Sequence, residues 1–231
     1  PGTIRLGAVV RRVLPTGEGA EVWYEQDTLR RVIARHVVLA VPARVADHLM
    51  DRGVTSPRPE ASPWRVAALH VDREPGGYGV PRAWDSVLHG GVGLGYVSSA
   101  HQRLGAGGGG VLSWYEPLSQ GPPRDAARAL LEATWEGEID RVLTDLSVAH
   151  PRLRRSLIRA DVMHWGHGTV RPGLGLHDVG ALADLARPMG PVSFAHTDLS
   201  GMSLFEEASW HGVRAAEEAL ERLGRAGTSL L

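Results

Sequence analysis

The sequence contains no cysteine, no lysine and no asparagine, and all of its cationic side chains are arginine. The lack of cysteine excludes disulfides, thiolate nucleophiles, and thiolate ligation of zinc or of iron–sulfur clusters. The lack of lysine excludes a Schiff base, a phosphate-loop lysine and a lysine general base. The lack of asparagine excludes N-linked glycosylation. Exclusive use of arginine is typical of a GC-rich genome, so we interpret it first as codon bias.

Long apolar runs and an excess of one charge are also missing. No apolar run approaches the roughly 18 residues that span a bilayer, and no signal peptide is visible. The formal net charge is -1, which gives no electrostatic reason to expect nucleic acid or an anionic membrane surface. We therefore expect a cytoplasmic protein that has a small-molecule substrate, no nucleic-acid partner and no membrane span. The oligomeric state stays open, with a homo-oligomer as one outcome.

The rest of the composition is typical of a globular protein, except that glycine is abundant. The 231 residues are 43% hydrophobic and 22% charged, enough chain for one large domain or two small ones. The 29 glycines predict many loops and tight turns. The expected strands are 4–13, 20–26, 31–41, 64–72, 86–88, 95–98, 111–115, 158–165 and 192–195. The expected helices are 43–52, 124–148, 178–185 and 206–223, with Gly224 ending the last one.

The order of these elements predicts two lobes. Strands open the chain, and a strand and helix close it, so both ends are expected in one domain. Residues 53–63 hold three prolines and are predicted to be a linker. We therefore assign 1–53 and 166–224 to one domain, 54–165 to an inserted lobe, and 225–231 to a tail.

The most informative stretch is 194–216. Its apolar strand ends in the carboxylate of Asp198, a Gly/Ser loop follows, and a helix begins at Phe205. A helix N-terminus offers free N–H groups and the positive end of the helix dipole. This stretch resembles the C-terminal flavin-binding segment of the FAD-dependent amine oxidase superfamily, which includes monoamine and polyamine oxidases, protoporphyrinogen oxidase and the carotenoid desaturases. The matching runs are Ala195-His196-Thr197-Asp198 and Gly212-Val213-Arg214-Ala215-Ala216.

The resemblance implies roles for individual residues. Asp198 would bind the ribityl or pyrophosphate part of FAD, and the alternative is that it only caps the loop that follows it. The backbone N–H groups of Leu204, Phe205 and Glu206 would lie near the pyrimidine edge of the flavin. The sequence departs from the family pattern at His196, which replaces the usual glycine, and at Glu207, where a helix glycine is common. His196 would face either the cofactor or the surface.

Three further stretches resemble motifs of the same superfamily. The run 2–13 is similar to a strand in which the residue at Val10 contacts the adenine side of FAD through its backbone. The run 34–42 is similar to the strand that enters the flavin site, which implies cofactor contacts at Ala40 and Pro42. The run 165–173 resembles a turn that precedes the last flavin contacts and begins at Trp165.

One family feature is missing. A dinucleotide-binding domain of this kind has a strand, a Gly-x-Gly-x-x-Gly turn and a helix whose N-terminus holds the pyrophosphate. The only match, 105–110, precedes a strand instead of a helix, so we interpret it as a connection. The predicted fold is α/β: a partial FAD-binding Rossmann-like domain with an inserted α+β substrate lobe. The resemblance implies the C-terminal part of a longer flavoprotein.

The expected reaction is transfer of a hydride from a C–N or C–C bond of a small organic substrate to FAD. Amine-oxidising members commonly place a lysine near the flavin, and this chain has none, which favours a protoporphyrinogen-oxidase-like or desaturase-like member. The rival hypothesis is a non-catalytic binding or scaffold module that keeps the fold without cofactor. No catalytic residue is identified. No metal is expected, although His164 and His167 have the spacing His-x-x-His.

Overall fold

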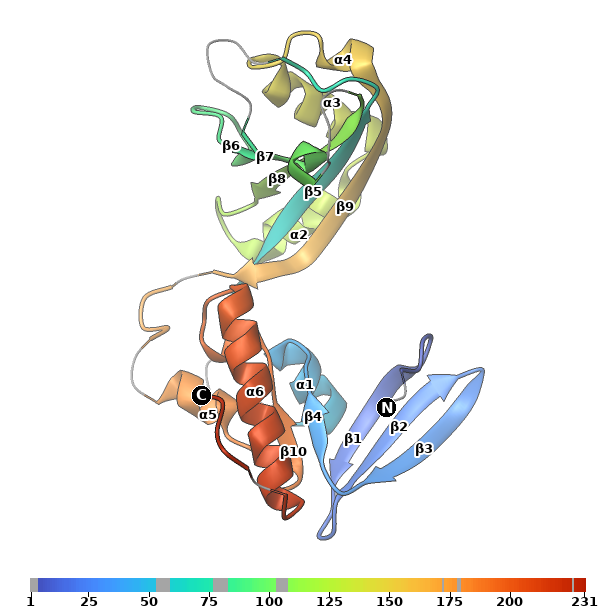
Figure 1. The fold of residues 1–231 in the computed structure, drawn as a ribbon, viewed down its shortest axis with the longest axis vertical. Coiled ribbons are helices and arrows are strands. Elements are labelled where there is room, and N and C mark those ends of the chain that lie inside the picture. The colour runs from blue at the N-terminus through green and yellow to red at the C-terminus, as the bar shows by residue number, and fades with distance from the viewer. Residues whose placement is uncertain are drawn as a thin grey trace. The chain divides into compact units, whose positions relative to one another are not determined.

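The computed structural model describes residues 4–52, 59–76, 83–102, 108–171, 173–177, 180–225 and 227–231. The chain divides into two compact units (Figure 1). Unit 1 combines Pro1–Glu60 with Val170–Leu231, and unit 2 is Ala61–Thr169. Unit 2 is therefore an insertion into unit 1. The boundaries predicted from the sequence, after residues 53 and 165, lie before both of these.

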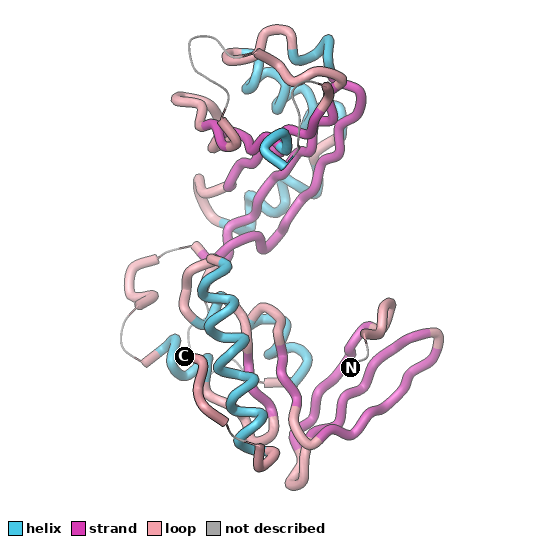
Figure 2. The backbone as a smooth tube through the Cα atoms, viewed as in Figure 1, coloured by secondary structure: helices cyan, strands magenta, loops and turns pink. Residues whose placement is uncertain are grey.

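Unit 1 begins with an antiparallel meander whose three strands run side by side (Figure 2). Asp27 forms the tight turn between the second and third strands with a φ of 60°, a region that aspartate tolerates better than most residues. The first two strands bury part of one face, whereas the third is exposed along nearly all of its length. The strands are β1 (Val9–Pro15), β2 (Ala20–Gln26) and β3 (Thr28–Ala34).

The rest of unit 1 is a short parallel sheet with helices packed around it. Strand β4 (Val37–Leu39) pairs with β10 (Val192–Phe194) in parallel. Helix α6 (Phe205–Arg222) contacts both strands. The other elements are α1 (Ala43–Met50), α5 (Ala181–Ala186) and the 3₁₀ turn η2 (Thr197–Leu199). The core that joins them to the meander contains Val13, Ala20, Leu39, Ala46, Leu49, Met50, Leu185, Val192, Phe194 and Leu199.

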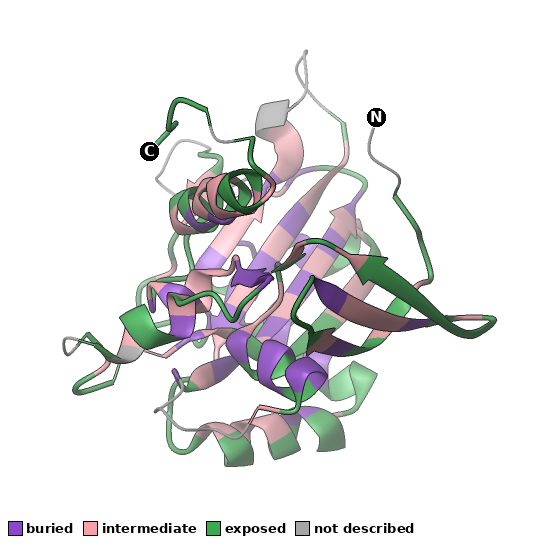
Figure 3. Cartoon of the chain, turned by 90° about the horizontal axis from the view of Figure 1, so that it is seen from below, coloured by how far each residue is buried: buried purple, intermediate pink, exposed green. Residues whose placement is uncertain are grey.

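Unit 2 is built on a five-stranded sheet in the order β6-β7-β8-β5-β9. Buried and half-buried residues alternate along most of β5, an interior strand of this sheet (Figure 3), as expected when one face packs against a helix. The buried side carries Ala67, Leu69, Leu112 and Trp114 and packs on α3. The elements are β5 (Ala61–Val71), β6 (Asp85–Ser86), β7 (Gly95–Ser98), η1 (Ser99–Gln102), β8 (Gly110–Pro117), α2 (Pro123–Glu132), α3 (Trp135–Ser147), α4 (Leu153–Ser156) and β9 (Leu157–Val170).

The strand predicted over 31–41 is wrong as a single element. The meander strand ends at Ala34, and the apolar run forms β4 in a different sheet. The N–H of Val37 donates to Pro191 O at 2.9 Å, so this run pairs with a segment far along the chain. The run is also not buried on both faces, because Val38 is 40% exposed.

The helix predicted over 124–148 is two helices. The chain becomes extended at Ala133, and Thr134 starts α3 by accepting a hydrogen bond from the N–H of Gly137 at 3.2 Å. Threonine is a preferred N-cap residue, and acidic residues such as Glu136 and Glu138 favour the first turn. The helical spacing of apolar residues continues across the break between α2 and α3. That spacing alone therefore predicts a single helix.

The glycine-rich turn predicted after residue 165 is also wrong. Strand β9 continues without interruption to Val170. A Cβ on Gly168 would lie 2.5 Å from Cδ1 of Trp64, and Trp64 Nε1 donates to Thr169 at 2.8 Å. Glycine in this strand therefore permits the close approach of a tryptophan ring.

Some predictions fall partly or wholly outside the described residues. These are the start of the motif at 2–13, most of the linker 53–63, the glycine run before residue 108, Pro172 in the motif at 165–173, and the start of the helix predicted at 178–185. Within the described part of the chain, no helix is both long enough and apolar enough to cross a membrane.

Candidate functional site

The ends of the two parallel strands bring four of the predicted residues to one edge. Ala40 and Pro42 follow β4, and His196 and Asp198 follow β10. Because β4 and β10 run in parallel, their carboxyl ends meet at the same edge, which is where open α/β sheets bind ligands. The N–H of Ala195 donates to Leu39 O at 3.0 Å and holds the two ends together.

Asp198 connects this edge to the start of α1. Its Oδ2 accepts a hydrogen bond from the N–H of Ala43 at 2.9 Å. Helix α1 follows Pro42 and has no side-chain cap of its own, so the carboxylate satisfies a free N–H at the positive end of the helix dipole. The hydrogen bond of this carboxylate joins it to a helix far earlier in the sequence, and the choice between a cofactor contact and a cap of the following loop stays a prediction.

His196 lies against the same carboxylate. Its Nδ1 is 3.1 Å from the backbone nitrogen of Asp198 and 3.1 Å from Oδ1. Burial raises the pKa of Asp198, but the hydrogen bonds with His196 and with the Ala43 N–H outweigh burial, so the pKa lies below its usual value. Asp198 is therefore ionised at neutral pH. The three residues Ala43, His196 and Asp198 form one polar group at the strand ends.

The start of α6 places Leu204, Phe205 and Glu206 together. Leu204 occupies the N-cap position without a side-chain hydrogen bond, and the first N–H bonded to it is that of Ala208 at 3.1 Å. The N–H groups of residues 205–207 have no acceptor in the part of the chain that the structure describes. Leu204 is 52% exposed and Phe205 is 83% exposed. This helix end thus offers three amide donors beside apolar side chains.

Polar contacts hold α6 on the sheet. Arg214 donates through Nη2 to Phe194 O at 2.6 Å, and it pairs with Glu218 one turn further along α6. His211 is 2% exposed, and its Nε2 lies 2.7 Å from Oγ of Ser200, which follows η2. The helix that carries the free amides is therefore fixed relative to the strand end that carries Asp198.

The other two predicted cofactor residues belong to the meander and to unit 2. Val10 is in β1, where its partly buried side chain packs on the core of unit 1. Trp165 is in β9 of unit 2 and is 53% exposed. The structure thus brings Ala40, Pro42, His196 and Asp198 to one edge, and α6 contacts that region through His211 and Arg214. The cofactor roles assigned to all of these residues, to the start of α6, to Val10 and to Trp165 stay predictions.

Two participants at the site escaped the sequence analysis. They are the N–H of Ala43 and the hydroxyl of Ser200. The first is a backbone group of an alanine, and the second is the hydroxyl of one serine among several in the sequence. A signal existed for the first, because a helix that starts after Pro42 with no Ser, Thr, Asp or Asn at its N-cap needs an acceptor from elsewhere. Nothing in the sequence pairs Ser200 with His211.

In unit 2, the sheet face opposite α3 carries a row of aromatic and polar contacts. Trp64 stacks on Tyr115 with ring centroids 6.3 Å apart, and the Tyr115 hydroxyl donates to Asp85 at 3.2 Å. Burial and the Asp85 charge raise the pKa of Tyr115. On the same face, His70 Nε2 lies 3.1 Å from Asp161 Oδ2. This face offers apolar rings together with paired polar groups.

The metal alternative has no support in the geometry. His164 lies 3.8 Å from Glu138 of α3. His167 is three residues further along β9, and residues three apart in a strand point to opposite faces. In the described ranges, no group of three or more His, Asp or Glu side chains is placed to hold a metal ion.

Two histidines, the buried His211 and the half-buried His36, make unit 1 sensitive to acid. Burial lowers the pKa of His211 below its ordinary value of 6.5, and the charge of Arg214 lowers it further. Burial and Arg222 act in the same way on the pKa of His36. Because the unfolded chain takes up these protons first as the pH falls, the histidines contribute full stability above about pH 6.5 and lose it as the pH falls through the folded pKa values.

We therefore expect the urea midpoint of unfolding to fall between about pH 7.5 and about pH 5.5. The drop should be smaller in His211→Gln, which does not titrate. Equal drops in wild type and variant would show that His211 does not contribute.

Comparison with known proteins yields structures only. No family model matches the chain, and no curated protein matches it. Among solved structures, cyclohexylamine oxidase from Brevibacterium oxydans is similar, with a TM-score of 0.67 and 19% identity over 94% of this chain and 48% of that one. Wild-type putrescine oxidase bound to putrescine matches with a TM-score of 0.64 and 20% identity over 93% of this chain and 48% of that one.

A putrescine oxidase redesigned in its cofactor binding matches with a TM-score of 0.64 and 18% identity over 95% of this chain and 49% of that one. The chain thus spans about half the length of the solved structures that it matches. At such low identity the likeness establishes the fold alone: a mixed helix and sheet arrangement shared with about half of these oxidases.

Proposed function

We propose that this chain forms about half of an FAD-dependent oxidoreductase of the amine oxidase superfamily, in which unit 1 holds the flavin and unit 2 binds the substrate. The reaction would take a hydride from a C–N or C–C bond of a small organic substrate. The fold likeness to two oxidases supports this assignment. The motif resemblances in both ends and the middle of the chain support it independently of that likeness.

The observation that carries the proposal is the free start of α6. Three amide N–H groups without an acceptor and two exposed apolar side chains are a suitable donor set for a flat heterocycle with a carbonyl edge. The residues present therefore fit the ring system of FAD. When bound, FAD would accept the hydride, as flavins do.

The protein's own residues would bind and orient this group. The N–H groups of Phe205 and Glu206 would donate to the ring edge, and Phe205 and Leu204 would exclude water from it. Asp198 would hold the strand ends in place through its hydrogen bond with Ala43. This role is compatible with the predicted contact between Asp198 and the ribityl or pyrophosphate part of FAD. The predicted backbone contacts at Val10, Ala40 and Pro42 belong to this same proposal.

The parallel sheet of unit 1 supports a partial Rossmann-like domain. Hydrogen-bonding groups alternate sides along a strand, so those of Val38 point away from β10. They have no partner within the residues that the structure places. The outer side of β10 is occupied, because Val192 exchanges hydrogen bonds with Met189 and Arg214 donates to Phe194 O. A sheet this small is rarely stable alone, so β4 offers the edge at which more strands would add.

The substrate type within the superfamily is a finer proposal. The two oxidases are named for amine substrates, whereas this chain has no lysine to serve as a proton relay. Arginine is a poor replacement, because its pKa stays above about 12. We therefore favour a protoporphyrinogen-oxidase-like or desaturase-like reaction. The rings of Trp64 and Tyr115 on the sheet face opposite α3 are compatible with such a substrate.

A second candidate, a binding or scaffold module without cofactor, has its own supporting observation. Side chains occupy two positions where the family has glycine, at His196 and Glu207. The carboxylate of Asp198 already has partners in Ala43 and His196. A site whose space and hydrogen bonds are taken up by the protein's own side chains keeps its shape without a ligand.

The visible spectrum of the protein expressed from its whole reading frame decides between the two candidates. Flavin absorption that stays with the protein through gel filtration supports the oxidoreductase. A colourless protein that does not take up added FAD would favour the scaffold.

Replacing Asp198 by alanine should weaken FAD retention by about tenfold, because a hydrogen bond to a charged group contributes roughly 1.5–3 kcal/mol. The loss of the α1 cap should also lower stability by about 1 kcal/mol. The measurements are FAD titration and thermal melting. Asp184→Ala is the matched control, since Asp184 forms a surface ion pair with exposed Arg187 in unit 1. Equal FAD retention in Asp198→Ala and in the control would refute the assigned role.

A further inference from the structure

Ser200 and His211 form a contact that the proposed function does not use. Ser200 directly follows η2, and its N–H donates to Thr197 O at 3.1 Å. Its Oγ lies 2.7 Å from Nε2 of His211. His211 comes from α6 and is almost fully buried. The pair therefore joins the turn that carries Asp198 to the helix that carries the free amides.

The buried surroundings of His211 determine where its proton resides. Its Nδ1 is buried and has no hydrogen-bond partner among the described residues. The charged or titratable groups around the ring are Glu207, Arg214 and Glu218 of α6 and His196 of the β10 loop. Burial and Arg214 lower the pKa of His211, which keeps the ring neutral near pH 7. A neutral ring carries one N–H, on either Nδ1 or Nε2.

Of the two tautomers, the one with the proton on Nε2 costs less. A proton on Nδ1 would bury a donor without an acceptor, which is among the costlier defects in a folded protein. A proton on Nε2 donates to Ser200 Oγ. The hydroxyl oxygen then acts as acceptor, and the Ser200 O–H is left to donate elsewhere. No described residue supplies an acceptor for it.

This arrangement is different from a serine nucleophile activated by histidine. Activation requires Nε2 to accept the serine proton and an acceptor to hold Nδ1–H. Here Nδ1 has no such partner. The pair instead orients the Ser200 hydroxyl so that its proton is free to donate to another group.

We propose that Ser200 is a ligand-binding hydroxyl, held in place by His211, that donates to an acceptor oxygen of the cofactor bound at the strand ends. This rests on the proposed flavin function. The accepting atom would be a carbonyl, ribityl or phosphate oxygen, and FAD contains all three. His211 is the positioning residue, because it acts through Ser200.

The first test measures the tautomer and needs no cofactor. Long-range ¹H–¹⁵N NMR of the ¹⁵N-labelled protein expressed from its whole reading frame, near neutral pH and without added FAD, should place the His211 proton on Nε2. A neutral ring with its proton on Nδ1 would overturn the proposal, because Nε2 would then accept the serine proton and leave no O–H to donate to a ligand.

The second test measures binding of FAD and of riboflavin to the protein expressed from its whole reading frame. Ser200→Ala should weaken FAD binding by about threefold to tenfold, the range for a neutral hydrogen bond. His211→Leu should cause a similar loss, and the double variant should lose no more than either single one, because His211 acts through Ser200. His211→Gln keeps an N–H donor and should restore part of the loss. Ser209→Ala, on the exposed side of α6, is the control.

The outcomes separate this proposal from the function on which it rests. A loss with both ligands assigns the acceptor to the ring or ribityl part, and a loss with FAD alone assigns it to the phosphates. Full FAD binding by Ser200→Ala, with wild-type binding intact, overturns the role of Ser200 and leaves the flavin function standing. A wild-type protein that binds neither ligand overturns both.

Discussion

Replacing Arg65 by alanine is expected to lower the free energy of unfolding of unit 2 by about 3–5 kcal/mol. Arg65 lies on β5 between the sheet and α3, and it is 7% exposed. It forms ion pairs with Glu116 of β8 and with Glu138 of α3. Both carboxylates are themselves buried, so neither can turn to water when its partner is lost.

The large effect comes from the charges left behind. A buried ion pair contributes little against a well-packed apolar replacement, but removing one partner leaves an uncompensated buried charge. Arg141 would still bind Glu116 through two hydrogen bonds of 3.0 and 2.5 Å. Among the residues that the structure describes, the charged partner left to Glu138 would be His164, at 3.8 Å. The cost should therefore fall mainly on Glu138.

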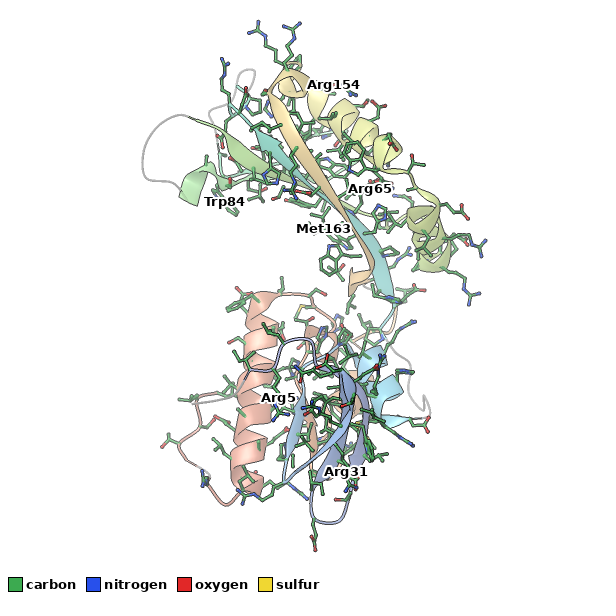
Figure 4. The ribbon with its side chains drawn as sticks, turned by 90° about the vertical axis from the view of Figure 1, so that its right-hand side faces the viewer. Arg5, Arg31, Arg65, Trp84, Arg154 and Met163 are labelled. Carbon is green, nitrogen blue, oxygen red and sulfur yellow. The ribbon has the colours of Figure 1, made fainter. Side chains whose placement is uncertain are left out.

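Urea unfolding of Arg65→Ala, followed by tryptophan fluorescence, checks this expectation. Arg154→Ala is the matched control, because Arg154 also pairs with a carboxylate but lies at the surface of unit 2 with 55% of its side chain exposed (Figure 4). Exposed pairs contribute only about 0–1 kcal/mol. Similar losses in the two variants would contradict the argument. The double variant Arg65→Ala/Glu138→Ala should recover part of the stability if the charge of Glu138 is the cause.

The parts of the fold that the sequence predicts well are those set by local residues. The last helix was expected over 206–223, and α6 spans Phe205–Arg222. Its end was predicted from Gly224, which adopts a φ of +67° as a C′ glycine does. The short strand before it was expected at 192–195, and β10 spans Val192–Phe194. Periodicity and a glycine stop signal suffice for such elements.

The errors arise where tertiary contacts decide. The apolar run that forms β4 leaves the meander because Pro191, far along the chain, offers a hydrogen-bond acceptor to Val37. Strand β9 continues through Gly168 because Trp64 packs where a side chain would be. No local pattern contains these partners. Only the break at Thr134 had a local signal, since a threonine followed by acidic residues is typical of a helix start.

The candidate site was predictable as segments and not as contacts. The motif resemblance indicated the strand end with Asp198 and the start of α6. It did not indicate that Asp198 would bond to Ala43, because that contact joins residues 155 positions apart. Nor did it indicate the Ser200–His211 pair, in which one partner is buried by packing. Sequence signals thus found the elements of the site, and the fold determined which atoms meet.

Asp145→Ala is expected to be the second most destabilising change, with a loss of about 3 kcal/mol. Asp145 lies on α3 and is 9% exposed. Its Oδ1 accepts a hydrogen bond from the N–H of Val92 at 2.7 Å, and its Oδ2 accepts one from Trp114 Nε1 at 2.8 Å and one from the N–H of Gly93 at 3.3 Å. One carboxylate therefore joins the helix, the central sheet and the loop that leads into β7.

The expected loss of stability comes from the hydrogen-bond donors that would have no acceptor after the change to alanine. Trp114 is fully buried, so its Nε1–H has no access to water when the acceptor is removed. A buried donor without an acceptor costs roughly 1–3 kcal/mol, and the backbone donors of the loop add to this cost. Gly93 cannot move inward to compensate, because a Cβ there would already lie 2.5 Å from the Trp114 ring. The loop should instead detach.

Two measurements separate this mechanism from simple loss of packing. Urea unfolding should give the stability loss, and amide hydrogen exchange should show faster exchange at Val92 and Gly93 than in wild type. Asp145→Asn is the discriminating variant: its amide has one acceptor oxygen where the carboxylate has two, so it should keep one contact and lose part of the stability. Asp140→Ala, on the exposed side of α3, should change neither. Unchanged exchange at the loop in Asp145→Ala would refute the claim that this carboxylate holds the loop against the sheet, and would place the source of any stability loss at Trp114 alone.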